Sequence, residues 1–560
     1  MNDKFITMKN KNEILKDNIC YALNDKRNVA YLLNADKCSD LTEIIIPEKI
    51  TYKKIEYKVT EIAMYAFSYC KLLETIMMPD SIKRIDHFAF ENCTSLKTIT
   101  FSKKLKYIGY SAFGGCTSLE SIVIPRGVKE IDKQAFDGCS SLRSIILPNS
   151  IGTINEETFR DCTALTSINI SSNVNSIQNL AFKNCSSLTE ITLPNNITYI
   201  GNSAFENCSS LTEVTIPNSV TDIEWQAFSK CISLKSVVIS KSVLHFGGDI
   251  FEYTPWFENL PDGPIYLNQC FYKYKGEMPT DFHIDIKEGT TTICDFAFSD
   301  CKNLKSISIP QSVTQIGAEA FSCCESLSSI ELPKELIQIE FGTFCGCSSL
   351  RSITIPSKVE RIEKHAFELC KHLETIIIPD SVKCIDCDAF NCCTELKNIV
   401  LPSNLIYIGS QAFAYCTSLQ SISIPDGITE IPRGQFISCS SLKSITLPNT
   451  IKQIADDAFS SCESLQSIVL PESLITIGNM AFYDCSSLSE IIIPKSVLNI
   501  GKEAFWDCPS LKTVTILNEM PPSIESNSLT IEEIKVPKKS LTKYKRSKIW
   551  KKIAKYTPID

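Results

Sequence analysis

The chain has 560 residues, of which 44% are hydrophobic and 21% charged, and its net charge at pH 7 is −8. These values are ordinary for a soluble globular protein, and the small negative charge argues against nucleic acid as a partner over most of the surface. No run of about 18 apolar residues occurs, so the sequence predicts no transmembrane segment. Residues 1–16 are polar and show no secretion signal, which leaves a cytoplasmic location open.

The first 40 residues lie outside any periodic pattern. Residues 19–23 and 29–33 are apolar and flank a polar stretch at 24–28, which predicts a β-hairpin. We interpret residues 1–40 as an N-terminal cap, because the first coil of a stacked array must cover its open end.

From residue 41 the sequence repeats with a period of 23. The unit from Phe113 to Ala135 reads F-x-x-C-x-x-L-x-x-I-x-I-P-x-x-V-x-x-I-x-x-x-A. Nineteen phenylalanines keep this period in two registers, nine from Phe67 to Phe251 and ten from Phe298 to Phe505. A fixed period of this length is typical of a solenoid, which grows along one axis and needs no second globular core.

Within each unit the L-x-x-I-x-I segment alternates at its end, which predicts one short parallel strand with both isoleucines pointing inward. Proline usually follows the strand, where its missing N–H costs no ladder bond. The V-x-x-I segment predicts a return leg with a short strand or 3₁₀ turn, and A-F-x-x-C predicts the corner.

Eighteen of the 27 cysteines occupy one position of the unit, three residues after the repeat phenylalanine. One cysteine per coil predicts a stacked column of small buried side chains. Disulfides would instead need specific pairs, so we interpret the column as reduced, structural thiols.

The complete template resembles the BspA-type leucine-rich repeats, over about residues 41–517. The resemblance implies a right-handed, β-rich leucine-rich-repeat solenoid, with a first array at 41–251 and a second at 288–517. It also implies a non-catalytic protein that recognises other proteins, in adhesion or surface recognition, with host or extracellular-matrix proteins as possible ligands.

Residues 252–287 interrupt the array with an aromatic-rich segment that reads as a turn followed by a hairpin. Two interpretations remain: the rings form an interaction patch, or they bury a defect in the coil. The second is favoured, because aromatic side chains usually serve as core.

Residues 518–560 end the periodic pattern and predict a C-terminal cap. Residues 531–560 hold ten Lys or Arg and three Asp or Glu, and an apolar stripe predicts a basic amphipathic helix: Leu541, Tyr544, Ile549, Trp550 and Ile553. The helix could contact acidic lipid or nucleic acid, but we favour a plug for the last coil whose lysines remain solvated.

No motif of catalysis, phosphate binding or dinucleotide binding occurs. Cys384, Cys387, Cys392 and Cys393 form the one cluster that looks like a set of ligands, but their spacing is a poor zinc template. We therefore expect no enzymatic activity, no metal and no cofactor.

The surface available for function is the outward side of the strands, at two and four residues after each repeat leucine. Hydroxylated and β-branched residues dominate both columns, which suits a stiff docking face, although β-propensity alone would also select them. The candidate partner-binding residues are Thr98, Thr100, Ser121, Ser144, Thr192, Thr215, Ser306, Ser329, Ser352, Thr354, Ser421, Ser423, Ser444 and Thr446.

Three functions fit these observations. Protein recognition in adhesion is favoured, and an intracellular scaffold without a surface role is the alternative, supported by the reduced-looking cysteines. A regular threonine face that orders water or ice is weakened by Met77, Asn169 and Glu331, which interrupt the column.

Overall fold

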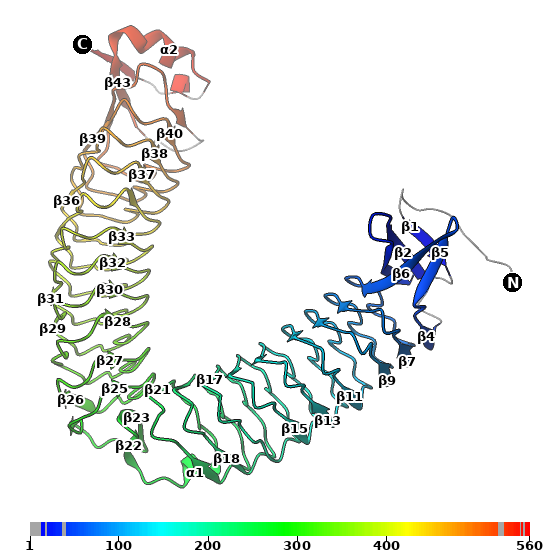
Figure 1. Cartoon of the computed structure of the whole chain (residues 1–560). Helices are drawn as coiled ribbons and strands as arrows, with labels where there is room; N and C mark the ends of the chain where they lie inside the picture. Colours follow the sequence, from blue (N-terminus) through cyan, green and yellow to red (C-terminus); the bar gives the residue numbers. More distant parts are fainter. Residues whose placement is uncertain (1–12, 17–18, 36–40, 525–530, 549, 553–554) are drawn as a thin grey trace. The chain divides into compact units, whose positions relative to one another are not determined.

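The computed structural model describes residues 13–16, 19–35, 41–524, 531–548, 550–552 and 555–560 (Figure 1). The chain divides into two compact units, Met1–Pro261 and Asp262–Asp560. Both units are parallel β-solenoids, and the chain forms about 21 coils at the predicted spacing of about 23 residues. Among the described residues, no helix has the length and hydropathy needed to cross a bilayer.

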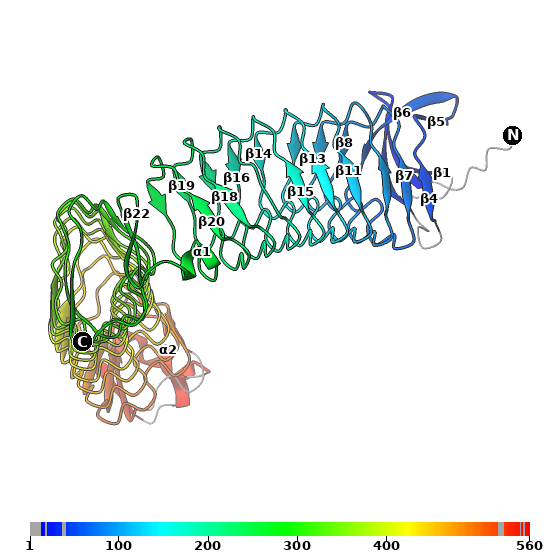
Figure 2. The ribbon, with the colours of Figure 1, turned by 90° about the horizontal axis from the view of Figure 1, so that it is seen from below.

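Most coils carry two short strands on opposite sides. The L-x-x-I-x-I segment supplies an outward strand and the V-x-x-I segment a return strand. In the second unit the two rows lie on opposite sides (Figure 1), and the coils superimpose into a flattened tube when viewed along the unit (Figure 2). Strands of neighbouring repeats pair in parallel at equivalent positions, as Ser121 with Ser144 and Ile122 with Ile145, whereas the pair β24–β26 has a register shift at Phe282.

The outward strands are β4 (Glu43–Ile45), β7 (Thr75–Met77), β9 (Thr98–Thr100), β11 (Ser121–Val123), β13 (Ser144–Ile146), β15 (Ser167–Asn169), β18 (Glu213–Thr215), β20 (Ser236–Val238), β24 (Phe282–Asp285), β26 (Leu304–Ser308), β29 (Ser352–Thr354), β31 (Thr375–Ile377), β34 (Ser421–Ser423), β36 (Ser444–Thr446), β39 (Glu490–Ile493) and β41 (Thr513–Ile516). The return strands are β8 (Arg84–Ile85), β10 (Tyr107–Ile108), β12 (Glu130–Ile131), β14 (Thr153–Ile154), β16 (Ser176–Ile177), β17 (Tyr199–Ile200), β19 (Asp222–Ile223), β21 (His245–Phe246), β25 (Thr292–Ile293), β27 (Gln315–Ile316), β28 (Gln338–Ile339), β30 (Arg361–Ile362), β32 (Cys384–Ile385), β33 (Tyr407–Ile408), β35 (Glu430–Ile431), β37 (Gln453–Ile454), β38 (Thr476–Ile477), β40 (Asn499–Ile500) and β42 (Ser523–Ile524).

The N-terminal end is covered by a small antiparallel arrangement. β2 (Ile19–Asn24) and β3 (Val29–Ala35) form the predicted hairpin, and β1 (Glu13–Lys16) adds a third strand. The extra residues of the first coil form a second hairpin, β5 (Lys49–Tyr52) and β6 (Ile55–Ile62). Because β6 pairs with both β3 and β8, the cap continues directly into the sheet of return strands.

The interruption at 252–287 forms a helical turn, α1 (Pro255–Glu258), and a hairpin of β22 (Gly263–Leu267) and β23 (Cys270–Lys275). β23 pairs in parallel with β25, as a return strand would. Phe271 is buried and stacks on Phe298 with the ring centroids 4.4 Å apart. The hairpin therefore begins the second unit's core, and this ring belongs to the core.

At the C-terminal end the helix is shorter than the apolar stripe predicted. α2 (Leu541–Arg546) is only six residues long, and Ser547 at its end is extended. Trp550 in the 3₁₀ turn η3 (Trp550–Lys552) is buried and donates its indole N–H to the Pro522 carbonyl. Burial of this ring against the last coil overrides the helical periodicity; Ile549 and Ile553 lie outside the described residues. A short 3₁₀ turn, η2 (Lys538–Ser540), joins α2 to β43 (Glu533–Pro537), which pairs with β44 (Lys555–Ile559).

The core consists of columns in which each residue lies over its counterpart in the next coil. Successive phenylalanine rings within each array are nearly parallel, with centroids 5.0 to 5.9 Å apart, as in Phe113–Phe136. Each ring is fully buried or nearly so. The stack thus removes a large apolar area from water in every coil.

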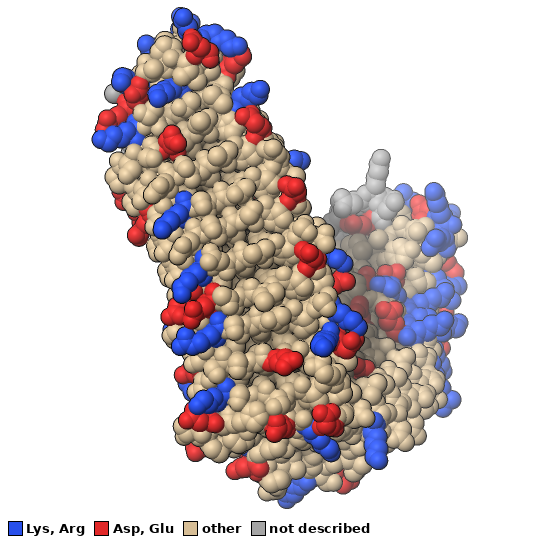
Figure 3. All heavy atoms as spheres, turned by 90° about the vertical axis from the view of Figure 1, so that its left-hand side faces the viewer, with Lys and Arg blue, Asp and Glu red and all other residues tan. Residues whose placement is uncertain are grey.

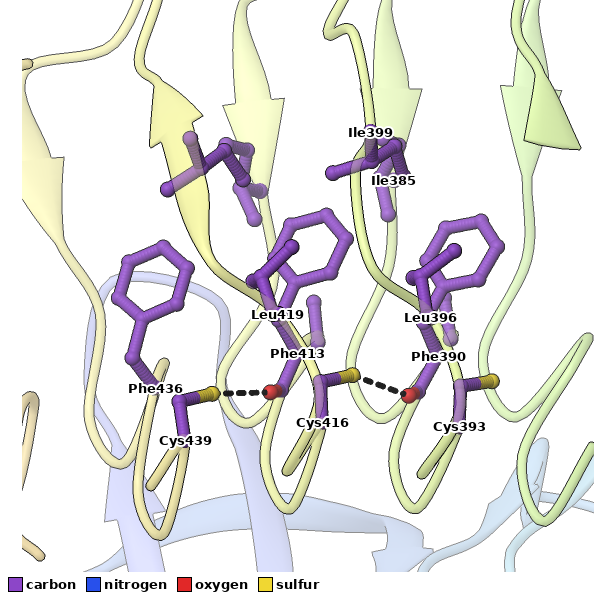
Figure 4. Close-up of a cluster of buried hydrophobic side chains, with 14 of the residues drawn as sticks. Ile385, Phe390, Cys393, Leu396, Ile399, Phe413, Cys416, Leu419, Phe436 and Cys439 are labelled. Carbon is purple, nitrogen blue, oxygen red and sulfur yellow. Dashed lines mark hydrogen bonds between the residues drawn. The ribbon is translucent and has the colours of Figure 1, made fainter. Parts of the chain in front are cut away.

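The cysteine column forms hydrogen bonds between coils as well as filling space. In Figure 4 the Cys416 thiol donates to the Phe390 carbonyl and the Cys439 thiol to the Phe413 carbonyl, with Sγ–O distances of 3.2 and 3.1 Å. Sixteen column cysteines make this bond to the phenylalanine 26 residues earlier. A buried carbonyl with spare acceptor capacity is thereby satisfied.

One member of the column contradicts the prediction of reduced thiols. Cys70 is disulfide-bonded. The other seventeen column cysteines are free thiols, as predicted. Cys70 belongs to the first complete coil and has no preceding repeat phenylalanine whose carbonyl could accept from a thiol, so its role differs from that of the later rungs.

The corner of each coil uses a backbone conformation that the template does not reveal. Residues two before and two after the repeat phenylalanine have positive φ, as Gln134 (57°) and Gly138 (69°) do around Phe136. Asn and Gly suit these positions, but Leu369 (60°) and Tyr415 (57°) also adopt this conformation. A bulky residue with left-handed backbone dihedrals costs about 1–2 kcal/mol. Stacking against the neighbouring coils therefore sets the backbone conformation of the corner, even where the residue itself disfavours it.

We expect Cys416→Ala to destabilise its coil by about 1–2 kcal/mol, because it removes one hydrogen bond and leaves a small cavity. Hydrogen exchange of peptides that span Phe390 and Cys416 measures the loss locally. Cys387→Ala, at a half-buried cysteine outside the column, is the control and should shift exchange little. Equal effects of the two substitutions would contradict a role for the thiol bond.

The thiol column also predicts a loss of stability at alkaline pH. Burial raises the pKa of Cys93 and Cys439 from 9.0 to about 12, and it raises the pKa of Cys416 as well. The unfolded chain therefore releases these protons first, so the stabilisation is complete below about pH 9 and declines as pH rises toward 12. Urea unfolding at pH 8, 9 and 10 should show a decline that becomes smaller when several column cysteines are replaced by alanine; a flat profile would contradict the prediction.

Candidate functional site

The outward face is defined here as the residues two and four positions after each repeat leucine. The structure places the fourteen predicted binding residues on this face, and all are exposed except Ser306, which is half-buried. Their partners in the ladder are their own counterparts, as Ser421 with Ser444 and Ser423 with Thr446. The inward isoleucine between them, such as Ile422, is buried.

Charged residues are scarce on this face. Figure 3 views the second unit from the side on which Figure 1 labels β26, β29, β31 and β36, and a broad uncharged band runs along it with most charges near the margins. Depletion of charge is a property of the cores of protein–protein interfaces. Hydroxyl groups supply the polarity instead.

Large apolar side chains are exposed on the same face. Val400 and Val469 are 81% and 84% exposed, and Val123, Ile146 and Ile377 are also exposed. They contribute nothing to the buried core beneath the strands. Because they sit in a rigid ladder, they would lose little conformational entropy against a partner.

Among the described coils, the ladder of outward strands is interrupted at residues 190–192, 329–331, 398–400 and 467–469, where at most an isolated bridge forms. A shallow hollow lies at each of the first two interruptions. The first hollow, of about 620 Å³, has among its lining residues Glu190, Thr192, Glu213, Thr215 and Val238. In the first hollow two glutamates occupy neighbouring coils at one position, and such like charges destabilise a ladder.

The second hollow, of about 650 Å³, lies in the second unit. Ser306, Ser329, Glu331, Ser352 and Thr354 are among the residues that line it. Four candidate binding residues, Ser306, Ser329, Ser352 and Thr354, line the second hollow. Two others, Thr192 and Thr215, line the first.

A polar cluster that the sequence did not predict lies at the start of the second unit's face. His283 Nδ1 is 2.7 Å from Ser306 Oγ, and His283 Nε2 is 3.1 Å from Asp285 Oδ1 and 3.3 Å from Ser308 Oγ. A hydrogen bond from Ser308, followed by one from His283, lowers the pKa of Asp285. The alternation of Ile284 and Ile286 was the signal that could have placed His283 and Asp285 on this face.

Serine, histidine and aspartate are also the residues of a hydrolytic triad. However, the side chains of His283 and Asp285 are 48% and 79% exposed, whereas the carboxylate of such a triad acts when it is buried. The arrangement is better suited to a polar anchor that offers both donors and acceptors to a docked surface.

The four clustered cysteines do not converge. Cys393 is a member of the thiol column and donates to the Phe367 carbonyl at 3.2 Å, while Cys384 lies on the return strand β32. Within the described parts of the chain, no three His, Cys, Asp or Glu side chains are grouped in a way that could hold a metal ion.

Residues of the outward face should be replaceable without loss of the fold. Val469→Ser should change stability by less than about 0.5 kcal/mol, because the side chain is exposed. Ile468→Ser, one residue away but only 6% exposed, should cost several times more through a buried hydroxyl and a cavity. Thermal unfolding and hydrogen exchange of the matched pair would contradict this assignment if the two substitutions had similar effects.

The chain was compared with known proteins. Crystal structures of leucine-rich repeat proteins are similar to it: a cell surface protein from Faecalibacterium prausnitzii (25% identity, 78% of this chain, 95% of that chain, TM-score 0.37) and a protein from Bacteroides ovatus (24%, 98%, 99%, 0.28). A third, from T. pallidum, shares 30% identity over 35% of this chain and 88% of its own, with a TM-score of 0.33. A search of curated proteins found no match.

The profile of the BspA type leucine rich repeat region matches six times, at residues 36–151, 60–175, 129–258, 268–393, 361–468 and 429–548. These matches cover most of the chain and include both arrays. The protein therefore belongs to the BspA-type leucine-rich repeat family.

Proposed function

We propose that the protein recognises another protein through the outward face of its strands. The observation that carries this proposal is the face itself: exposed valine and isoleucine among hydroxyl groups, in a band depleted of charge. The fold needs none of these exposed side chains, since its core lies on the other side of each strand. A large, preorganised surface of this kind suits a macromolecular partner better than a small molecule.

We further propose that this recognition serves adhesion or surface recognition, with host or extracellular-matrix proteins as the class of ligand. The proposal rests on membership of the family. Antibody staining of expressing cells before and after permeabilisation tests it, and staining only after permeabilisation would contradict it.

The second candidate function is an intracellular scaffold that binds proteins through the same face. The seventeen free thiols of the column support it, because such thiols are typical of reducing compartments. The disulfide at Cys70 favours the surface role instead. The same staining experiment separates the two candidates.

Arginine substitutions on the face should weaken binding strongly. We expect Ser352→Arg, Thr354→Arg, Ser421→Arg and Ser423→Arg together to weaken capture of a partner at least tenfold, since each places a long charged side chain across the docking surface. Gln453→Arg and Asn499→Arg, at exposed positions of the return strands, are the matched control. If the control lost binding and the face variant kept it, the site would lie on the return side.

A further inference from the structure

We infer that the partner presents arginine or lysine among apolar side chains, and that the first hollow is the main anchor for such a cation. This inference rests on the proposed function, because it specifies the chemistry of a partner docked on the same face. It follows from the sign of the charges on the face, from the lining of the hollow and from the apolar residues beside it.

The outward face excludes cations while carrying carboxylates. In the eighteen coils whose repeat leucine lies between Leu73 and Leu511, the thirty-six positions of the outward face hold no lysine or arginine. They hold four acidic residues: Glu190, Glu213, Glu331 and Glu490. At the position just before the face, one residue after the leucine, eight of the same eighteen residues are lysine or arginine.

This contrast is specific to the face, because the chain as a whole has 56 lysines and arginines against 64 acidic residues. Exposed strand positions tolerate lysine well, and lysine is a common guard against aggregation at exposed strand edges. Selection for solubility would therefore not remove lysine from the face. Its absence indicates a contact that a positive charge on this face would weaken. A partner surface that is itself basic has this property.

The first hollow concentrates this chemistry. Its two charged lining residues are Glu190 and Glu213, at the same position of neighbouring coils, and its lining includes no lysine or arginine. Neither glutamate forms an ion pair with any described residue. Thr192 and Thr215, which both carry hydroxyl groups, belong to the same lining.

Two carboxylates with hydroxyl neighbours suit a guanidinium group. Arginine has five N–H donors in a planar fork and can bond two acceptor groups at once. It also binds carboxylates bidentately and tolerates partial loss of hydration better than lysine. Arginine is accordingly the preferred occupant of the hollow.

The hollow also has an apolar border that fits an interface. Val238 lines it and is 55% exposed. A partner that combined an arginine with apolar residues would bury this side chain at the same time as it neutralised the carboxylates. Such a combination matches the enrichment of arginine at the centres of protein interfaces.

The test uses the full chain and three cyclic β-hairpin peptides. One presents alternating valine and arginine, and in the others citrulline or glutamate replaces arginine; citrulline keeps the shape but lacks the charge. Binding is measured by fluorescence anisotropy at low and moderate salt. We expect the arginine peptide to bind at least tenfold more tightly than either of the others, with an advantage that shrinks as salt increases.

The Glu190→Gln/Glu213→Gln variant should lose that advantage, and because both side chains are exposed it should fold as the parent does. Glu120→Gln, at an exposed carboxylate outside the face, should keep it. Equal binding of the arginine and citrulline peptides, or an unchanged advantage in the double variant, would overturn the inference.

A natural partner separates this inference from the proposed function. If the face-blocking arginine variant loses that partner and the double glutamine variant keeps it, the cation anchor is wrong and the docking face stands. If the arginine peptide binds as expected but the natural partner binds both variants as tightly as the parent protein, the proposed function is wrong. If the protein self-associates and the double glutamine variant does not, the occupant of the hollow is a second copy of the chain. That result would overturn the inference that the partner is a different protein.

Discussion

Most coils of this protein are held by contact with a coil of the same pattern 23 residues away. The phenylalanine ring lies on the next ring, and the thiol three residues later donates to the carbonyl of the preceding coil's phenylalanine. Both contacts require that neighbouring coils have the same path, because a ring or a sulfur displaced by one residue would meet no partner. The constraint explains why neither array slips over its whole length, and why bulky residues accept a left-handed backbone at the corners.

A stack of repeated coils leaves an uncovered core wherever the repeat stops. The two ends and the interruption at 252–287 cover this core in different ways. At the N-terminus, β6 connects a three-stranded antiparallel cap to the return strands. At the middle, the hairpin of β22 and β23 provides a substitute return strand, and Phe271 takes the place of a repeat ring. At the C-terminus, Trp550 and Tyr544 cover the last coils with buried rings whose polar groups bond to the Pro522 and Asn518 carbonyls.

Packing between neighbouring coils restricts the choice of residue least on the outward face. Its side chains lie in register because the backbone beneath them is in register, but they are exposed and the core does not select them. Composition there can respond to a partner, and the observed choice is hydroxylated, β-branched and free of cations. Rigidity makes the face useful, since a ladder of strands presents its side chains at fixed spacing without the entropy cost of ordering loops.

The sequence alone determined the coil, its period and the inward and outward residues of each strand, because one pattern repeated nineteen times leaves little freedom in register. It could not determine the disulfide at Cys70, since a column of identical cysteines hides the one that differs. Tertiary structure decided the short α2 helix, where burial of Trp550 outweighs local periodicity. It also decided the two hollows and the cluster around His283, which depend on how neighbouring coils meet at positions where the template allows any residue.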